Sequence, residues 1–390
     1  MRRRAILFWL AVLALVVVSG CGVSVPASDQ PESVDPPEIE SEEFVPESKI
    51  ITIALVGDIM VHDAQIDSAY NAVTGEYEFD GSFEAIAPYL KRADVVIGNL
   101  ETTLAGEHLV YGGYPRFNSP ESLAGALKRA GFTILTTANN HCLDRGAEGV
   151  RNTLDYLDQY GLKHAGTARS QEERQSLLIY SVQGIQLGIL SYTYGTNGLP
   201  IPAGQEYLVN LIDRDAMARD IEELRRKEVD LILTFLHFGN EYQKKLSKEQ
   251  KELVDWLQSQ GVECILGSHP HVLQPAEFDL ENGYLVIYSL GNFISAQKGL
   301  ERQSSAVYYL TVVQDHQGLT RLEAVSFLPI YTYRYREQGK FAVKVLPLSD
   351  SFLQQPGDWD QELLHQARIE VMNVMRTENI RVYAEEEKMM

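Results

Sequence analysis

The chain has 390 residues, of which 54 are acidic and 34 basic, so that its formal net charge is −20. This balance argues against nucleic-acid binding, which requires a basic face, and three widely spaced cysteines cannot form a disulfide framework. The hydrophobic content of 45% is typical of a globular protein. The chain is long enough for one large domain, with or without an extension.

The N-terminal segment predicts export and lipid anchoring. Three arginines at residues 2–4 precede an apolar run over residues 5–18, which is shorter than the ~20 residues of a membrane-spanning helix. The run leads into Ser19-Gly20-Cys21, similar to the lipobox of bacterial lipoproteins. We expect a signal peptide over residues 1–20, lipidation of Cys21, and attachment to the extracytoplasmic face of the bacterial cell membrane. An uncleaved anchor helix and an ordinary signal peptide are the alternatives.

Residues 21–48 form an acidic, proline-rich tether. They contain five prolines and eight acidic residues but no lysine or arginine. Such a segment cannot bury enough apolar surface to fold, and its charges repel one another. We interpret it as a spacer between the membrane and a folded domain.

The next part of the chain alternates apolar strands with amphipathic helices. We expect strands at residues 50–56, 95–97, 134–137, 186–192, 231–236, 264–266 and 283–289. We expect helices at residues 83–91, 121–130, 147–160, 213–227 and 247–260. Ser247 and Gln250 form a capping box at the start of the last helix. The alternation predicts a largely parallel sheet with helices on both faces.

The last part of the chain departs from this alternation. Residues 304–313 and 320–328 predict a hairpin, and an antiparallel pair added to a parallel core suggests a second, mixed sheet. We place the main domain at residues 49–330. In a C-terminal extension over residues 331–390 we expect a strand pair and an amphipathic helix that packs on the domain. The alternative for that helix is a membrane-surface or partner helix.

Polar residues follow nearly every predicted strand at its carboxyl end, where open α/β sheets bind ligands. Asp58, His141 and His237 stand at three such ends. His269 and His271 stand two apart, so that both imidazoles of an extended segment can face one centre. Nitrogen and oxygen ligands suit Zn, Mn or Fe better than Ca or Mg, and we expect a divalent-metal site.

Other side chains near these strand ends extend the prediction. Asn99, Glu101 and Asn140 add oxygen donors. Arg116, on a long loop, can pair with an anionic substrate or be an ordinary surface arginine. A single histidine in such a loop is best explained by hydrogen bonding alone, but several strand ends together favour a metal.

Six segments of the chain, in order over about residues 51–293, resemble the CapA family of poly-gamma-glutamate capsule biosynthesis proteins. They are Gly57-Asp58-Ile59-Met60, Gly98-Asn99-Leu100-Glu101, Asn139-Asn140-His141, Leu236-His237-Phe238-Gly239-Asn240-Glu241-Tyr242, Gly267-Ser268-His269-Pro270-His271-Val272 and Tyr288-Ser289-Leu290-Gly291-Asn292-Phe293. The family is similar to the calcineurin-like metallophosphoesterases. The resemblance implies an α/β four-layer sandwich, in which two mixed β-sheets are flanked by helices.

The resemblance also implies roles for individual residues. His141 corresponds to the catalytic histidine, and the metal ligands are Asp58, Asn140, His237, His269 and His271. Two positions depart from the phosphoesterase pattern. Met60 stands where the first motif has a histidine, for which His62 is the nearest substitute. Asn99 stands where the phosphoesterases have the aspartate that bridges two ions, and Glu101 is the candidate to take over that role. The number of bound ions, one, two or none, therefore stays open.

Two functional classes follow from these features. In the first, the protein is a hydrolase that cleaves a phosphoester, or an amide in an anionic cell-surface polymer: a metal activates water, and His141 protonates the leaving atom or stabilises negative charge. In the second, a non-catalytic subunit binds nascent poly-gamma-glutamate or the synthase subunits. Retention of Asn140 and His141 favours the first class, and loss of the bridging aspartate favours the second.

Overall fold

The computed structural model describes residues 48–337, 339–355, 357–375 and 379–383. The predicted signal peptide, the lipidation site Cys21 and nearly all of the tether lie outside these residues. None of the described helices combines the length and the apolar composition that a membrane span requires.

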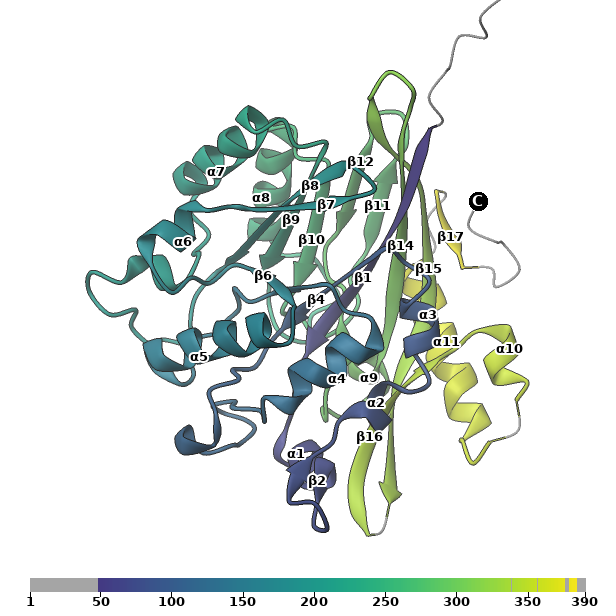
Figure 1. The fold of residues 1–390 in the computed structure, drawn as a ribbon. Coiled ribbons are helices and arrows are strands. Elements are labelled where there is room, and N and C mark those ends of the chain that lie inside the picture. The colour runs from purple at the N-terminus through teal and green to yellow at the C-terminus, as the bar shows by residue number, and fades with distance from the viewer. Residues whose placement is uncertain (1–47, 338, 356, 376–378, 384–390) are drawn as a thin grey trace, which may run out of the picture. The chain divides into compact units, whose positions relative to one another are not determined.

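The first of two large mixed β-sheets is built around the first strand of the domain (Figure 1). Its order is β16-β15-β14-β1-β4-β5-β6, with β13 beside β1 and β17 beside β15. The bounds are β1 (Lys49–Ile59), β4 (Val95–Leu100), β5 (Ile134–Thr136), β6 (Lys163–Ala165), β13 (Asn292–Ile294), β14 (Ser304–Gln314), β15 (Thr320–Glu337), β16 (Lys340–Pro347) and β17 (Ile380–Val382). Strands β1, β4, β5 and β6 are parallel, whereas β14, β15 and β16 are antiparallel.

The second large sheet has the order β11-β12-β10-β9-β8-β7. The bounds are β7 (Leu178–Val182), β8 (Ile185–Thr193), β9 (Leu231–His237), β10 (Cys264–Ser268), β11 (Ala276–Asp279) and β12 (Tyr284–Ile287). The four inner strands are parallel, and β7 and β11 are antiparallel edge strands. A separate small hairpin joins β2 (Tyr70–Asn71) to β3 (Glu76–Tyr77).

The predicted hairpin after residue 304 joins the first sheet instead of forming a second one. Strand β14 pairs with β1 from Lys49 to Leu55. The pairing covers the edge of β1 opposite β4, which would otherwise expose unpaired backbone groups. Strand β15 runs without interruption through residue 330, where we expected the main domain to end. The second sheet is mixed because of β7 and β11.

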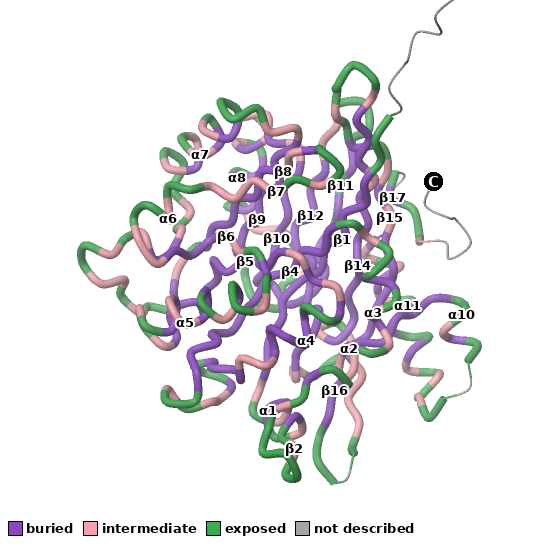
Figure 2. Tube along the Cα trace, in the orientation of Figure 1, coloured by how far each residue is buried: buried purple, intermediate pink, exposed green. Residues whose placement is uncertain are grey.

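Alternating side chains of the strands pack into two different cores. Ile51, Ile53 and Leu55 of β1 lie between the sheets, and Ala54 and Val56 face helices on the outside. Helices α4 (Ser122–Ala130) and α5 (Gly146–Gln159) cover the first sheet, and α7 (Arg214–Arg226) and α8 (Lys248–Ser259) cover the second. Figure 2 shows the buried strands at the centre and the exposed outer turns of these helices. The predicted fold class, two mixed sheets flanked by helices, is confirmed.

Most helices agree with the sequence to within one or two residues, and one prediction is wrong. In place of one helix over residues 83–91, the chain forms α2 (Asp80–Phe83) and α3 (Ala87–Leu90). Pro88, in the first turn of α3, has no N–H to bond within a longer helix. The capping box of α8 is present, with the Ser247 hydroxyl accepting from the Gln250 N–H at 3.1 Å.

Other helices complete the part of the chain that the structure describes. They are α1 (Asp63–Ala69), α6 (Gln171–Gln175), α9 (Leu300–Gln303), α10 (Asp350–Leu353), α11 (Gln361–Val374), and the short 3-10 helices η1 (Glu107–Leu109) and η2 (Glu206–Leu208). Helix α11 packs on the domain through buried Leu364, Ala367 and Val371. Val371 also reaches the core between the sheets.

Candidate metal centre

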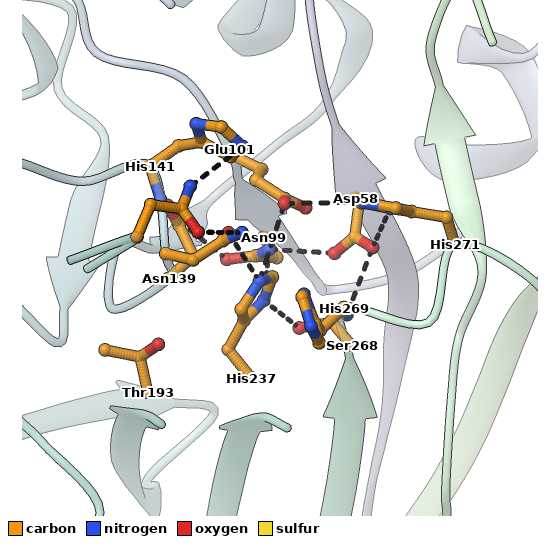
Figure 3. A network of polar contacts seen from close by, with 12 residues as sticks. Asp58, Asn99, Glu101, Asn139, His141, Thr193, His237, Ser268, His269 and His271 are labelled. Carbon is orange, nitrogen blue, oxygen red and sulfur yellow. Dashed lines mark hydrogen bonds and ion pairs between the residues drawn. The ribbon is translucent and has the colours of Figure 1, made fainter. Parts of the chain in front are cut away.

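Five ionisable side chains from both sheets converge where parallel strands end (Figure 3). Asp58 lies near the end of β1, Glu101 directly after β4, and His237 at the end of β9, while His269 and His271 follow β10. Each of the five residues is at most 4% exposed. Parallel strands end at the same edge of a sheet, so the topology itself brings these residues together.

Two sets of three residues can each hold a metal ion, and both sets include Glu101. One is Asp58, Glu101 and His237; the other is Glu101, His269 and His271; in each set the ligand atoms lie within 4.8 Å of one another. A Glu101 carboxylate oxygen is 3.4 Å from Nε2 of His237 and 3.7 Å from Nε2 of His271. Glu101 therefore occupies the position shared by the two sets.

Glu101 is the least satisfied polar group of this centre. Its carboxylate oxygens are buried and, among the described residues, accept no hydrogen bond; Nδ1 of His269 is equally without a partner. Burial raises the pKa of Glu101 well above its usual range, and the charge of Asp58 raises it further. A buried carboxylate without a donor is costly, and a cation would remove that cost. The residues therefore fit a divalent metal.

The histidines of the centre differ in protonation. Burial lowers the pKa of His237 to about 3 and that of His269 to about 2, so both are neutral at pH 7, as metal ligands must be. Burial also opposes the charge of His271, but Glu101 and Asp58 raise its pKa to about 9. Burial opposes ionisation of Asp58, yet His271 holds its pKa at about 2. Without metal, a protonated His271 therefore partly neutralises the Asp58 carboxylate, whose Oδ2 is 3.1 Å from its Nδ1.

The histidine pair reaches the centre through a strained backbone. His269 has φ 94° and His271 has φ 58°, a region that non-glycine residues rarely adopt. The explanation expected from the sequence, alternate side chains of an extended segment, is therefore wrong, although both imidazoles do converge. The glycines of the motifs permit close packing beneath them: a Cβ on Gly57 would lie 1.9 Å from the Gly291 oxygen, and one on Gly267 2.0 Å from that of Tyr288.

Asn99 supports the centre by orienting Asp58. Its side-chain N–H donates to Asp58 Oδ1 at 2.8 Å, while its Oδ1 accepts from Asn139 at 3.2 Å. Its oxygen is thus engaged away from the centre, and the Glu101 carboxylate takes the shared position. Asn140 faces the centre directly, with Oδ1 2.9 Å from Nε2 of His237.

His62 and Arg116, also predicted from the sequence, belong to neither ligand set. His62 precedes α1, where its Nδ1 accepts the Ala296 N–H at 3.3 Å and its ring packs edge-on against Phe117 at 5.2 Å. Arg116 is exposed and precedes Phe117, whose ring lies 4.7 Å from that of His141. Neither residue contacts a member of the two ligand sets through a hydrogen bond or ion pair among the described residues.

His141 forms a buried pair with a residue that the sequence analysis missed. Its Nδ1 is 2.8 Å from Asp144 Oδ2, and the same carboxylate oxygen accepts the Phe117 N–H at 2.6 Å. Since a carboxylate can only accept, the imidazole proton lies on Nδ1, and Nε2 is left to face Asn197, 3.5 Å away. The spacing of three residues between His141 and Asp144 is the sequence signal that could have revealed this pair.

Aromatic rings stand at the rim of the centre. The Tyr194 ring, half exposed, lies 4.7 Å from His269 and is stacked on His237 at 6.4 Å. Tyr242 lies 5.9 Å from His271. These rings therefore lie next to the three histidines of the two ligand sets.

Comparisons with known proteins show the family to which the sequence belongs. The family described as "Bacterial capsule synthesis protein PGA_cap" matches residues 52–297. The capsule biosynthesis protein CapA of Bacillus anthracis is 29% identical over 268 residues, which are 67% of this chain and 64% of that protein. The PGA biosynthesis protein CapA of Bacillus subtilis is 27% identical over 271 residues, 66% of this chain and 67% of that protein. The match thus spans about two thirds of each relative.

Solved structures that resemble this chain are more distant. A putative 5'-nucleotidase from Staphylococcus aureus is 14% identical with a TM-score of 0.47, over 82% of this chain and 58% of that chain. The calcineurin-like phosphoesterase YfkN from Bacillus subtilis is 13% identical with a TM-score of 0.43, over 85% of this chain and 100% of that chain.

Proposed function

Because this chain belongs to the PGA_cap family of bacterial capsule synthesis proteins, we propose that it is a metal-dependent hydrolase of capsule polymer synthesis, lipid-anchored outside the cell membrane. Its substrate would be an amide bond of an anionic polymer such as poly-gamma-glutamate, or a phosphoester. The observation that carries the hydrolase proposal is Glu101, a buried carboxylate without a hydrogen-bond donor, placed between His237 and His271.

The chain's own side chains supply distinct parts of the proposed chemistry. Asp58, Glu101, Asn140, His237, His269 and His271 would hold one or two ions of Mn, Zn or Fe. When bound, such a cation polarises the scissile group and makes water a stronger nucleophile near neutral pH. His141 holds or delivers a proton at Nε2, toward the leaving atom. Asp144 orients that imidazole through its contact with Nδ1.

A non-catalytic subunit that binds the polymer or its synthase subunits is the second candidate. The burial of the histidine ligands favours this candidate, because no histidine of the two ligand sets is more than 4% exposed. The replacement of the bridging aspartate by Asn99 also favours it. The Asp144–His141 pair favours the hydrolase, because binding alone does not require an oriented proton donor.

Metal loading followed by an activity assay separates these candidates. We expect Mn²⁺ at about 100 times its Kd to stabilise the chelator-treated protein by about 2.7 kcal/mol and raise its Tm by about 5 °C. The loaded protein should then hydrolyse a chromogenic phosphodiester or shorten poly-gamma-glutamate, and chelator should stop it. Stabilisation without hydrolysis of either substrate would support the binding subunit. No stabilisation by Mn, Zn or Fe would contradict the metal centre.

A further inference from the structure

The hairpin of β15 and β16 concentrates positive charge in an acidic chain. Its outer part carries four basic residues and one acidic residue, Glu337, whereas the whole chain has a net charge of −20. The basic residues are Arg334, Arg336, Lys340 and Lys344. The hairpin projects at the bottom of Figure 1, beside α1 and β2.

The two arginines share one face of the hairpin. Arg336 is paired with Phe341 and Arg334 with Val343, and paired residues of antiparallel strands lie on the same face. Both guanidinium groups lie over the Phe341 ring, at 5.3 Å for Arg334 and 4.3 Å for Arg336. Phe341 itself is 42% exposed. The result is a cluster of one exposed ring and two like charges, of which Arg336 is exposed and Arg334 is half-buried.

The two lysines belong to the other face of the hairpin, Lys344 beside a ring of β15 and Lys340 beside a ring of the neighbouring β2. Lys344 is 5.3 Å from the Tyr335 ring, and Lys340 is 5.9 Å from the Tyr70 ring. The Lys340 ammonium also donates to the Asp67 carbonyl oxygen at 3.0 Å. Both faces of the hairpin therefore combine cations with rings.

These cations lack the acidic partners that other surface cations of the protein have. Among the described residues, none of the four forms an ion pair; Arg336 donates to the Gly339 carbonyl, and Glu337 accepts from Tyr335. By contrast, Arg129 pairs with Asp80, Arg226 with Glu223 and Arg321 with Glu323. Like charges held close together repel one another, and a bound anion would remove that repulsion.

The hairpin is connected to the metal centre through neighbouring elements. Asp58 is paired with Asn292 of β13, and the next residue, Phe293, accepts a hydrogen bond from Thr332 of β15 at 3.3 Å. Helix α1 starts just after His62 and lies along β16, where Lys340 donates to its Asp67 carbonyl. The hairpin and the metal centre are thus linked through β13 and through α1.

We propose that this hairpin is a docking surface for a polyanion with closely spaced carboxylates, and that it holds the polymer beside the metal centre. The choice of polymer rests on the proposed function. Guanidinium groups bind carboxylates in pairs of parallel hydrogen bonds, and residues two apart on a strand are about 7 Å apart, so both arginines can engage one extended chain. An anionic membrane is the competing partner, which the test distinguishes.

The test measures binding of fluorescent poly-glutamate to the full-length protein, in chelator so that cleavage does not interfere. We expect the variant R334Q/R336Q to bind about fivefold more weakly than the wild type, because two charge contacts at the surface are lost. The control R226Q/R321Q removes the same charge from two ion-paired arginines and should bind like the wild type. R334K/R336K should recover most of the affinity, and all variants should keep the wild-type Tm.

Three results would overturn the proposal. R334Q/R336Q could bind poly-glutamate like the wild type, or the control could lose as much affinity, which would make the effect one of net charge alone. Vesicles of phosphatidylglycerol could depend on the two arginines while poly-glutamate does not, which would make the hairpin a membrane surface. Hydrolysis of a small phosphodiester and shortening of poly-gamma-glutamate by the metal-loaded protein report separately on the metal centre. The absence of both activities would contradict the proposed hydrolase and leave the binding comparison valid.

Discussion

Replacing Glu101 with glutamine is expected to abolish metal binding and at the same time to stabilise the metal-free protein. Glu101 belongs to both ligand sets, so its loss should weaken metal binding more than about 100-fold, beyond the effect of a residue that only orients a ligand. The metal-free protein loses a buried carboxylate that no donor satisfies and should gain about 1–3 kcal/mol in its free energy of unfolding. Metal content after purification, and urea unfolding in chelator, measure the two effects.

Glu263 provides the matched control for this substitution. It precedes β10, and its Oε2 is also buried without a hydrogen-bond partner among the described residues. Burial raises its pKa as well. Glu263→Gln should therefore change stability in the same direction while metal content stays at the wild-type value. Retention of metal by E101Q would show that Glu101 is not the shared ligand.

Replacing His141 with alanine is expected to reduce hydrolysis about 10²–10⁴-fold, the usual contribution of a positioned acid or base, while metal content is unchanged. His141 belongs to neither ligand set, and its Nδ1 is engaged by Asp144. Asp144→Asn should also reduce kcat, because an amide N–H facing Nδ1 disfavours the required tautomer. Steady-state kinetics on the metal-loaded variants, with metal analysis of the same samples, measure this.

His164 is the control histidine for these kinetics. It is largely buried and lies 3.3 Å from Asp158, an arrangement similar to that of His141 but outside the centre. His164→Ala should leave kcat near the wild-type value. Full activity of H141A would exclude His141 as the proton donor, and loss of metal from H141A would make it a ligand instead.

The strand ends around this centre could be predicted from the sequence, because each strand is a continuous apolar run. A buried parallel strand is a continuous apolar run, so the first polar residue after it marks the carboxyl edge of the sheet. Asp58, His237 and His269 could be placed in this way without knowing which strands are neighbours. The bounds of β9 and α8 followed from the same pattern and from the capping box.

Features that depend on local backbone or on distant pairing could not be predicted in this way. The positive φ angles of His269 and His271 leave no trace in a periodic pattern. The pairing of β14 with β1 joins residues more than two hundred positions apart, and β13 is three residues long, too short to show any period. Two features that the sequence analysis missed did have a local signal. Asp144 stands three positions after His141, and Pro88 interrupts the helix predicted over residues 83–91.

The most direct test of the account is a crystal of the protein grown with Mn²⁺ and measured for anomalous scattering at the manganese edge. The account predicts a peak with a Glu101 carboxylate oxygen among its nearest atoms, at about 2.0–2.2 Å, completed by Asp58 and His237 or by His269 and His271. A map with no peak beside Glu101, in crystals where manganese is present elsewhere, would contradict it.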